Sequence, residues 1–177
     1  MHRIIFLLFL ACCLPVHAEE VKICYNHDCA AHATVTFSEQ QLENVGALFN
    51  GIHDAASERE AIAQAVGMLA QYAGKQSPIF RDKGTDSDGD VDGRMDSLDH
   101  SFNTTAYLKV LEDRGLLMFH RVKSRVVRGA TKPHWSARIS EIRTHQEFAV
   151  DSWYFANGHP AVIFPLDEWL KGATPDA

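Results

Sequence analysis

The sequence predicts an α+β protein in which most helices come first and antiparallel strands follow. Up to Gly115, apolar residues recur every three or four positions over long stretches, which is the spacing of amphipathic helices. After Gly115, apolar and polar residues alternate in short runs, as in half-buried strands. No repeat or low-complexity linker divides the chain, so we expect one domain with helices packed on an antiparallel sheet.

The start of the chain is typical of a secretory signal peptide. A basic residue, Arg3, precedes an apolar run from Ile4 to Leu14 that is too short to cross a bilayer, and Ala18 ends a suitable cleavage site. A lipoprotein anchored at Cys12 is the alternative, although the residues before it depart from the usual lipobox. We therefore expect residues 1–18 to be removed and residues 19–177 to form a secreted or periplasmic domain without a transmembrane segment.

Charge and cysteines narrow the class of protein further. The formal net charge of −6 disfavours nucleic acid as a general partner. Cys24 and Cys29 are separated by four residues, and in an oxidising compartment this spacing predicts a disulfide that closes a small loop. A metal pair with His27 or His32 is the alternative, which is less favoured because no second cluster has zinc-ligand spacing.

The first elements expected are a short strand and a helix. Thr34 to Phe37 is rich in β-branched and aromatic residues, which favour strands. Ser38 and Gln41 have the spacing of a capping box, in which each side chain accepts a hydrogen bond from the other residue's backbone. The apolar face of the helix that follows is Leu42, Val45, Phe49 and Ile52.

Two further helices are expected before most of the strands. Ser57 and Glu60 have the spacing of a second capping box, and Gly74 should end that helix. After an irregular acid-rich loop, a third helix is expected from Ser97 to Arg114, closed by Gly115. The remaining chain predicts strands over residues 116–128, 135–142, 147–155 and 161–164 and a short helix over 166–171.

The acid-rich loop fits the template of a calcium-binding loop. The text from Asp88 reads DGDVDGRMDSLD, with acidic residues at positions one, three, five, nine and twelve and a glycine, Gly93, at position six. Aspartate in place of glutamate at position twelve predicts weaker binding. The alternative is a solvated acidic loop, and Pro78 and Gly84 argue against the incoming helix of a full EF-hand. The predicted Ca²⁺ ligands are Asp88, Asp90, Asp92, Asp96 and Asp99.

Three residues from separate segments, Ser97, His134 and Asp151, suggest a catalytic triad. Ser97 lies at the expected start of the third helix, where free backbone N–H groups and the helix dipole favour developing negative charge. His134 opens one predicted strand and Asp151 lies in the next, so a hairpin would make them neighbours. Each residue also has an ordinary explanation: an N-cap serine, a surface histidine and an aspartate that accepts backbone hydrogen bonds. His100 is expected at the surface or in the sheet.

These segments together resemble a known family. The run GRMDSLDHSFNTTAYLKVLEDRGLL, followed by HWSARI and FAVDSWYFANG, is similar to the bacterial transglutaminase-like cysteine proteinases, which have a papain-like fold and in some cases depend on calcium. The similar region extends from Asp86 to Gly158. The resemblance implies a transglutaminase-like fold, a protein or peptide substrate, and a triad made by Ser97, His134 and Asp151.

The sequence departs from the family at the nucleophile, because Ser97 stands where the family has cysteine. A serine hydroxyl is much less acidic than a thiol, so it needs His134 as a general base during the reaction. Three interpretations remain: a serine hydrolase on this fold, a catalytically inactive binding protein, or an engineered cysteine-to-serine form. We expect a weakly active or inactive member of a peptide-amide hydrolase or acyl-transferase lineage, with a non-catalytic calcium-dependent binding module as the alternative.

Overall fold

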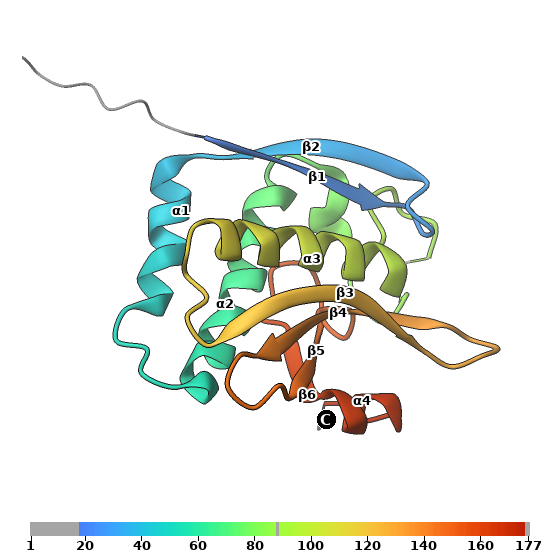
Figure 1. The fold of residues 1–177 in the computed structure, drawn as a ribbon. Helices are drawn as coiled ribbons and strands as arrows, with labels where there is room; N and C mark the ends of the chain where they lie inside the picture. Colours follow the sequence, from blue (N-terminus) through green and yellow to red (C-terminus); the bar gives the residue numbers. More distant parts are fainter. Residues whose placement is uncertain (1–17, 88, 176–177) are drawn as a thin grey trace, which may run out of the picture.

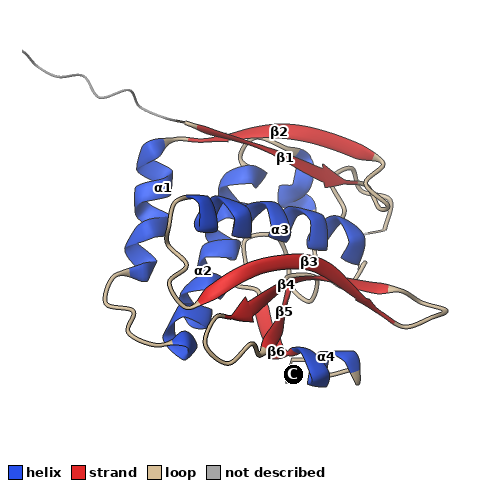
Figure 2. Cartoon of the chain, in the orientation of Figure 1, coloured by secondary structure: helices blue, strands red, loops and turns tan. Residues whose placement is uncertain are grey.

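The computed structural model describes residues 18–87 and 89–175, so the predicted signal peptide, apart from Ala18, and Asp88 lie outside the described residues. A two-stranded hairpin comes first, helices follow, and a four-stranded antiparallel sheet ends the chain (Figures 1 and 2). In chain order the elements are β1 (Glu19–Tyr25), β2 (Ala31–Phe37), α1 (Glu39–Gly46), α2 (Ala55–Gly74), α3 (Ser97–Asp113), β3 (His120–Arg128), β4 (His134–Glu141), β5 (Glu147–Asp151), β6 (Val162–Pro165) and α4 (Leu166–Leu170), with 3₁₀ turns at Ala47–Phe49 and Pro78–Arg81. The α+β class is therefore confirmed.

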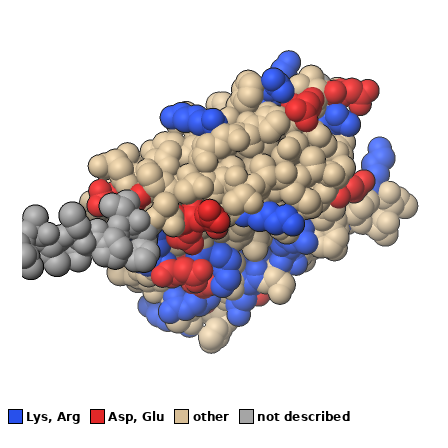
Figure 3. Space-filling model, turned by 90° about the horizontal axis from the view of Figure 1, so that it is seen from above, with Lys and Arg blue, Asp and Glu red and all other residues tan. Residues whose placement is uncertain are grey.

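The N-terminal hairpin is larger than the sequence predicted. β1 pairs with β2 from Glu19 opposite Phe37 to Tyr25 opposite Ala31, so the strand predicted over 34–37 is the second half of β2. β1 buries Val21 and Ile23 against the helices, because alternate residues of a strand point to the same face. Figure 3 views the molecule from this side and shows acidic and basic side chains in scattered groups of both signs.

The capping predictions for α1 and α2 had different outcomes. Ser38 caps α1 with the predicted reciprocal box to Gln41, but the helix ends at Gly46 and continues only as a 3₁₀ turn. For α2 the predicted box at Ser57 and Glu60 is wrong. Asp54 is the N-cap, since its carboxylate accepts the backbone N–H of Ser57 at 2.7 Å and also the Ser57 hydroxyl.

The central helix, α3, lies between the hairpin and the sheet (Figure 1). It contacts β1 on one side and β4 on the other, so it buries residues around most of its circumference, including Tyr107, Leu108 and Leu111. The helix ends as predicted, close to Gly115, whose φ of +70° suits glycine because it has no Cβ.

The four-stranded sheet has the order β3-β4-β5-β6, and every neighbouring pair is antiparallel. β3 begins at His120, later than predicted, and β5 ends at Asp151, before the predicted end at 155. Because Ala137 on β4 pairs with Val150 on β5, the first residues of β4 lie beside the last residues of β5, at one end of these two central strands. This register positions the candidate site.

Cys24 and Cys29 form a disulfide, as predicted. The bond closes the loop between β1 and β2. Within the described ranges, no helix combines the length and the apolar character needed to cross a membrane.

Candidate active site

The carboxylate of Asp151 is the most completely hydrogen-bonded group of the site. Its Oδ2 atom lies 2.7 Å from Nε2 of His134 and accepts the indole N–H of Trp169 at 2.8 Å. Its Oδ1 atom accepts the backbone N–H of Trp153 at 3.2 Å. The Asp151 side chain is 1% exposed, and buried carboxylates are tolerated when such donors surround them. The predicted neighbourhood of His134 and Asp151 is therefore present.

The His134 imidazole is held in one orientation by aromatic rings. The centroid of its ring lies 4.7 Å from that of Trp153 and 5.6 Å from that of Trp169, and Tyr154 is a third neighbour. Since Nε2 faces a carboxylate, the neutral ring carries its proton on Nε2, and Nδ1 keeps its lone pair. Nδ1 makes no hydrogen bond within the described residues, which leaves it available as a base.

Ser97 is the first residue of α3, and Asp96 rather than Ser97 is the N-cap. The Ser97 hydroxyl oxygen accepts the backbone N–H of Trp135 at 3.2 Å, which places it beside the peptide that follows His134. Among the described residues, no hydrogen bond joins Ser97 Oγ to the His134 imidazole. The structure thus brings the three predicted residues to one place and forms the histidine–aspartate contact, but not the serine–histidine hydrogen bond.

The first turn of α3 leaves backbone donors without acceptors. The N–H of Asp99 is bonded to the Asp96 carboxylate, and that of His100 to the Asp96 carbonyl. The N–H groups of Ser97 and Leu98 have no acceptor within the described part of the chain. Unpaired N–H groups at a helix start favour negative charge, which is the property required of an oxyanion site.

Asp96 and Asp99, two of the predicted calcium ligands, accept hydrogen bonds from the disulfide loop. Asp99 is fully buried and accepts the backbone N–H groups of His27 and Cys29 at 2.8 and 2.7 Å, while Asp96 accepts that of Asp28 at 2.8 Å. Burial, and then the charge of Asp96, raise the pKa of Asp99 to about 6, although the backbone hydrogen bonds oppose the shift.

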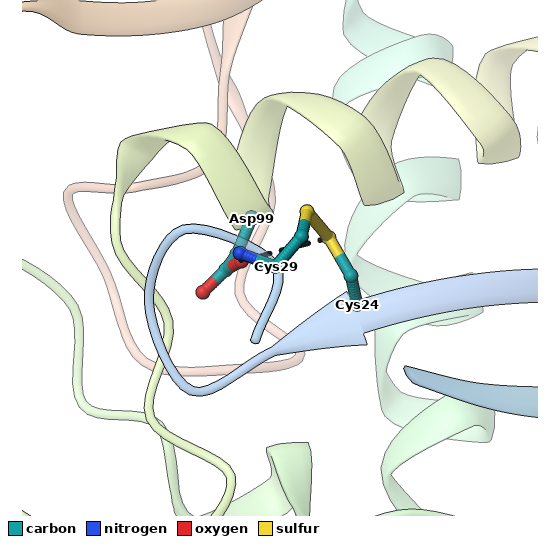
Figure 4. Close-up of side chains that lie close together, drawn as sticks. All are labelled: Cys24, Cys29 and Asp99. Atoms are coloured by element: carbon teal, nitrogen blue, oxygen red, sulfur yellow. Dashed lines mark hydrogen bonds between the residues drawn. A yellow bond between two sulfur atoms is a disulfide. The ribbon is translucent and has the colours of Figure 1, made fainter. Parts of the chain in front are cut away.

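The disulfide loop adopts an unusual backbone to make these contacts. Four consecutive residues from Asn26 to Cys29 have positive φ angles between 50° and 70°. Figure 4 shows the Asp99 carboxylate beside the disulfide, and the Cys24 and Cys29 sulfurs and an Asp99 oxygen lie within 4.8 Å of one another. This grouping resembles a metal site, but sulfurs joined in a disulfide are not thiolate ligands.

The other predicted calcium ligands in the described ranges are exposed. Asp90 lies 3.6 Å from Arg94, and Asp92 lies 3.8 Å from Arg81 and accepts a hydrogen bond from the Asn26 side chain. The four predicted ligands that the structure describes therefore divide into exposed residues in the loop, Asp90 and Asp92, and residues bonded to backbone N–H groups at the helix start, Asp96 and Asp99. Binding of Ca²⁺ remains a prediction.

No family model, curated protein or solved structure shows a significant match to this chain. The resemblance to transglutaminase-like proteinases therefore remains a prediction from the motifs.

Sequence reasoning missed a second group of polar residues behind the site. His100 is 5% exposed, not a surface residue, and its Nε2 atom lies 3.2 Å from Oδ2 of the equally buried Asp82. The distance is that of an ion pair, but the two atoms lack the alignment of a full hydrogen bond. Burial alone would lower the pKa of His100, but the contact with Asp82 and the charges of Asp82, Asp151 and Asp99 raise it.

The contacts of Trp169 were also missed, because they join segments far apart in the sequence. The indole of Trp169 is fully buried on the short helix α4 and bonds to Asp151. A tryptophan on a short helix near the chain end is a weak signal, since burial of its ring is sufficient reason for its presence. Asn103 on α3 satisfies two further buried groups, because its side-chain amide bonds to both the N–H and the carbonyl of Cys24.

Proposed function

We propose that this protein is a secreted or periplasmic member of the transglutaminase-like, papain-like class and that Ser97, His134 and Asp151 form its acyl-transfer site. The observation that carries the proposal is the 2.7 Å contact between His134 and Asp151 at the edge of the sheet, next to Ser97 at the first position of a buried helix. A nucleophile on a helix start, with its base and acid on adjacent antiparallel strands, suits peptide-amide hydrolysis or acyl transfer.

The proposed reaction uses the Nδ1 atom of His134 as the general base. Its Nδ1 takes the proton from the Ser97 hydroxyl as the oxygen attacks the carbonyl carbon of an amide, and the N–H groups of Ser97 and Leu98 stabilise the resulting oxyanion. The imidazolium, whose Nε2–H faces Asp151, then gives the proton to the leaving amine. Water or a second amine attacks the acyl-serine, giving a hydrolysed or transferred product and regenerating the hydroxyl.

The native sequence should carry out this chemistry slowly. Serine oxygen has a shorter bond to Cβ and a smaller radius than sulfur, and the structure contains no hydrogen bond from Ser97 to His134 in its described part. The Ser97 oxygen instead accepts the Trp135 N–H, a contact that would also stabilise a thiolate at the same position. We therefore expect Ser97→Cys to recover a reactive nucleophile.

The test compares the alkylation rates of cysteine variants with iodoacetamide near neutral pH. Ser97→Cys should react at least about tenfold faster than a free cysteine, because a lowered pKa increases the thiolate fraction. His134→Ala in that background should remove the enhancement. Ala55→Cys is the matched control, because Ala55 is also the first residue of a helix with an aspartate N-cap but lies near Glu141, at the end of β4 opposite to His134. Equal rates for the two cysteines would refute the proposal.

A calcium-dependent binding module is the second candidate. It is favoured by the connection between the acidic loop and the site: the indole N–H of Trp153 donates to Asp86 at 2.8 Å, and the backbone N–H of Thr85 donates to the Trp153 carbonyl. Because Trp153 also packs on His134, a cation in the loop would act on the site through this tryptophan. Equilibrium dialysis with ⁴⁵Ca²⁺ tests this candidate, and absence of saturable binding would exclude it.

A further inference from the structure

A buried polar network connects the two halves of the proposed site from behind. On the helix, His100 is one turn after Ser97, and its Nδ1 lies 3.0 Å from the hydroxyl of Ser152, the residue after Asp151. The same Ser152 hydroxyl lies 2.9 Å from the Thr104 hydroxyl, one turn further along α3. The start of α3 and the end of β5 are thus joined by side-chain contacts in addition to apolar packing.

The other imidazole nitrogen of His100 reaches a third segment. Asp82 faces His100 through Oδ2, accepts the backbone N–H of Met95 at 3.0 Å through Oδ1, and accepts the backbone N–H of Asn157 at 3.1 Å through its own carbonyl. Met95 immediately precedes the N-cap of α3, and Asn157 follows the segment that leaves β5. Asp82 therefore contacts both the segment that leads into α3 and the segment that follows β5.

We propose that His100, with Asp82 and Ser152, is a positioning residue that fixes the Ser97 end of α3 against the Asp151 end of β5. The proposal rests on the proposed function for its chemical consequence, but the tether itself is a separate physical claim. His100 touches neither substrate nor the reacting atoms; it acts through the backbone positions of Ser97 and Asp151.

The composition of the network supports a positioning role. Burying a histidine and an aspartate has a desolvation cost that a well-packed apolar pair would avoid, so such a pair contributes little stability beyond what apolar residues would give. The pair instead restricts the relative position of α3 and β5. Each polar contact fixes the distance between two particular atoms, whereas apolar side chains can shift past one another and remain in contact. The nucleophile and its base lie on different elements, and their separation must be held to within a fraction of an ångström for efficient transfer.

The chain offers a matched control in a second buried histidine. His120, at the opposite end of β3 from the site, is fully buried, and its Nδ1 lies 3.4 Å from the buried carboxylate of Glu58. Glu58 also accepts the backbone N–H groups of Met118 and Phe119, so this pair fixes the start of β3. His120→Gln therefore removes a buried histidine–acid pair of the same kind without touching the site.

The first measurement is hydrogen–deuterium exchange on the native chain and on its His100→Gln, Ser152→Ala and His120→Gln variants. We expect His100→Gln to accelerate exchange at least about tenfold both in the first turns of α3 and over residues 151–157. Ser152→Ala, a milder change, should accelerate the same two regions less. His120→Gln should accelerate exchange near residues 117–120 only. The tether would be overturned if His100→Gln accelerated exchange in only one of the two site regions. It would also be overturned if all three variants accelerated exchange equally throughout the described chain.

The second measurement is the iodoacetamide rate of the Ser97→Cys protein carrying the same changes. His100→Gln and Ser152→Ala should lower the rate at least about fivefold, Ser152→Thr should restore it by returning the hydroxyl, and His120→Gln should leave it unchanged. An unchanged rate in His100→Gln, or an equal loss in His120→Gln, overturns the positioning role. If Ser97→Cys itself reacts like a free cysteine, the proposed function fails, and the exchange pattern alone decides whether the tether exists.

Discussion

Trp169→Phe is expected to destabilise the protein through one lost hydrogen bond to a buried charge. The substitution keeps an aromatic ring on α4 but removes the indole N–H that lies 2.8 Å from Oδ2 of Asp151. That oxygen is also the partner of His134, so after the change the carboxylate depends on His134 and on the Trp153 N–H alone.

The magnitude follows from the burial of the acceptor. Hydrogen bonds to charged groups contribute about 1.5–3 kcal/mol, and the Asp151 side chain is 1% exposed, so water does not replace the lost donor. For a chain of this size, 1 kcal/mol lowers Tm by about 2–4 °C. The smaller ring adds a packing cost, so a double-mutant cycle with Asp151→Ala, which removes the acceptor, isolates the hydrogen bond, with an expected interaction energy of about 1.5–3 kcal/mol.

The assay is urea unfolding followed by far-UV circular dichroism, and Trp153→Phe is the control. The Trp153 indole N–H donates to Asp86, which is exposed, so its loss should cost at most about 1 kcal/mol. A cycle energy for Trp169 and Asp151 below about 0.5 kcal/mol would refute the reasoning, as would equal losses of stability in the two tryptophan variants.

Three further predictions concern the disulfide, calcium and pH. Thiol titration of denatured protein that lacks residues 1–18, carried out without reductant, should detect no free sulfhydryl, and two thiols per chain would disprove the bond between Cys24 and Cys29. Calcium should raise Tm by mass action, and Asp90→Ala with Asp92→Ala should abolish the rise; the same Tm in calcium and in chelator would show that the loop is only an acidic turn. Because the pKa of His100 is raised in the folded protein, its charge stabilises the fold below the unfolded-state value and that contribution disappears as pH rises through the folded-state value. His100→Gln should therefore lower Tm more at about pH 6 than at about pH 9, and a larger loss at the higher pH would contradict the direction of the shift.

A cavity beside the His100 network gives one more prediction. Tyr107 and Asn157 line a cavity of ≈ 20 Å³, and the Tyr107 hydroxyl and the Asn157 Oδ1 are buried with no hydrogen-bond partner among the described residues. That volume fits a single water molecule, and buried polar atoms are normally satisfied by one. A crystal structure at high resolution should show an ordered water within hydrogen-bond distance of both atoms, and an empty cavity in good density would contradict this assignment.

Local signals predicted the elements whose ends depend on neighbouring residues. Ser38 and Gln41 cap each other, and Gly115 takes the positive φ that ends α3, so both boundaries follow from chemistry within a few residues. The start of α2 was wrong because Asp54 competes with Ser57 for the same role and sequence spacing does not rank them. β1 was missed because it lies directly after the predicted signal peptide, and its strand character depends on pairing with β2.

In the site, too, contacts between neighbouring segments could be predicted from the sequence, whereas contacts between distant segments could not. The proximity of His134 and Asp151 followed from a hairpin between adjacent strands, which sequence spacing can predict. The role of Asp99 did not follow, because the donors that meet its carboxylate come from the β1–β2 loop, about 70 positions earlier in the chain. The contacts of His100 and Trp169 likewise depend on the packing of α3 and α4 against β5, which no local pattern encodes.

The most direct test of the central claim is the thiol pKa of the Ser97→Cys protein, measured from the thiolate absorbance near 240 nm as pH is raised. Cys24 and Cys29 are bonded to each other, so in protein produced without residues 1–18 the introduced thiol gives the signal without interference. If Ser97 occupies a nucleophile position beside His134 at the helix start, the apparent pKa should fall below about 7 and return toward about 8.5 in the His134→Ala background. A value of about 8.5 or above in the Ser97→Cys protein itself would contradict the acyl-transfer site.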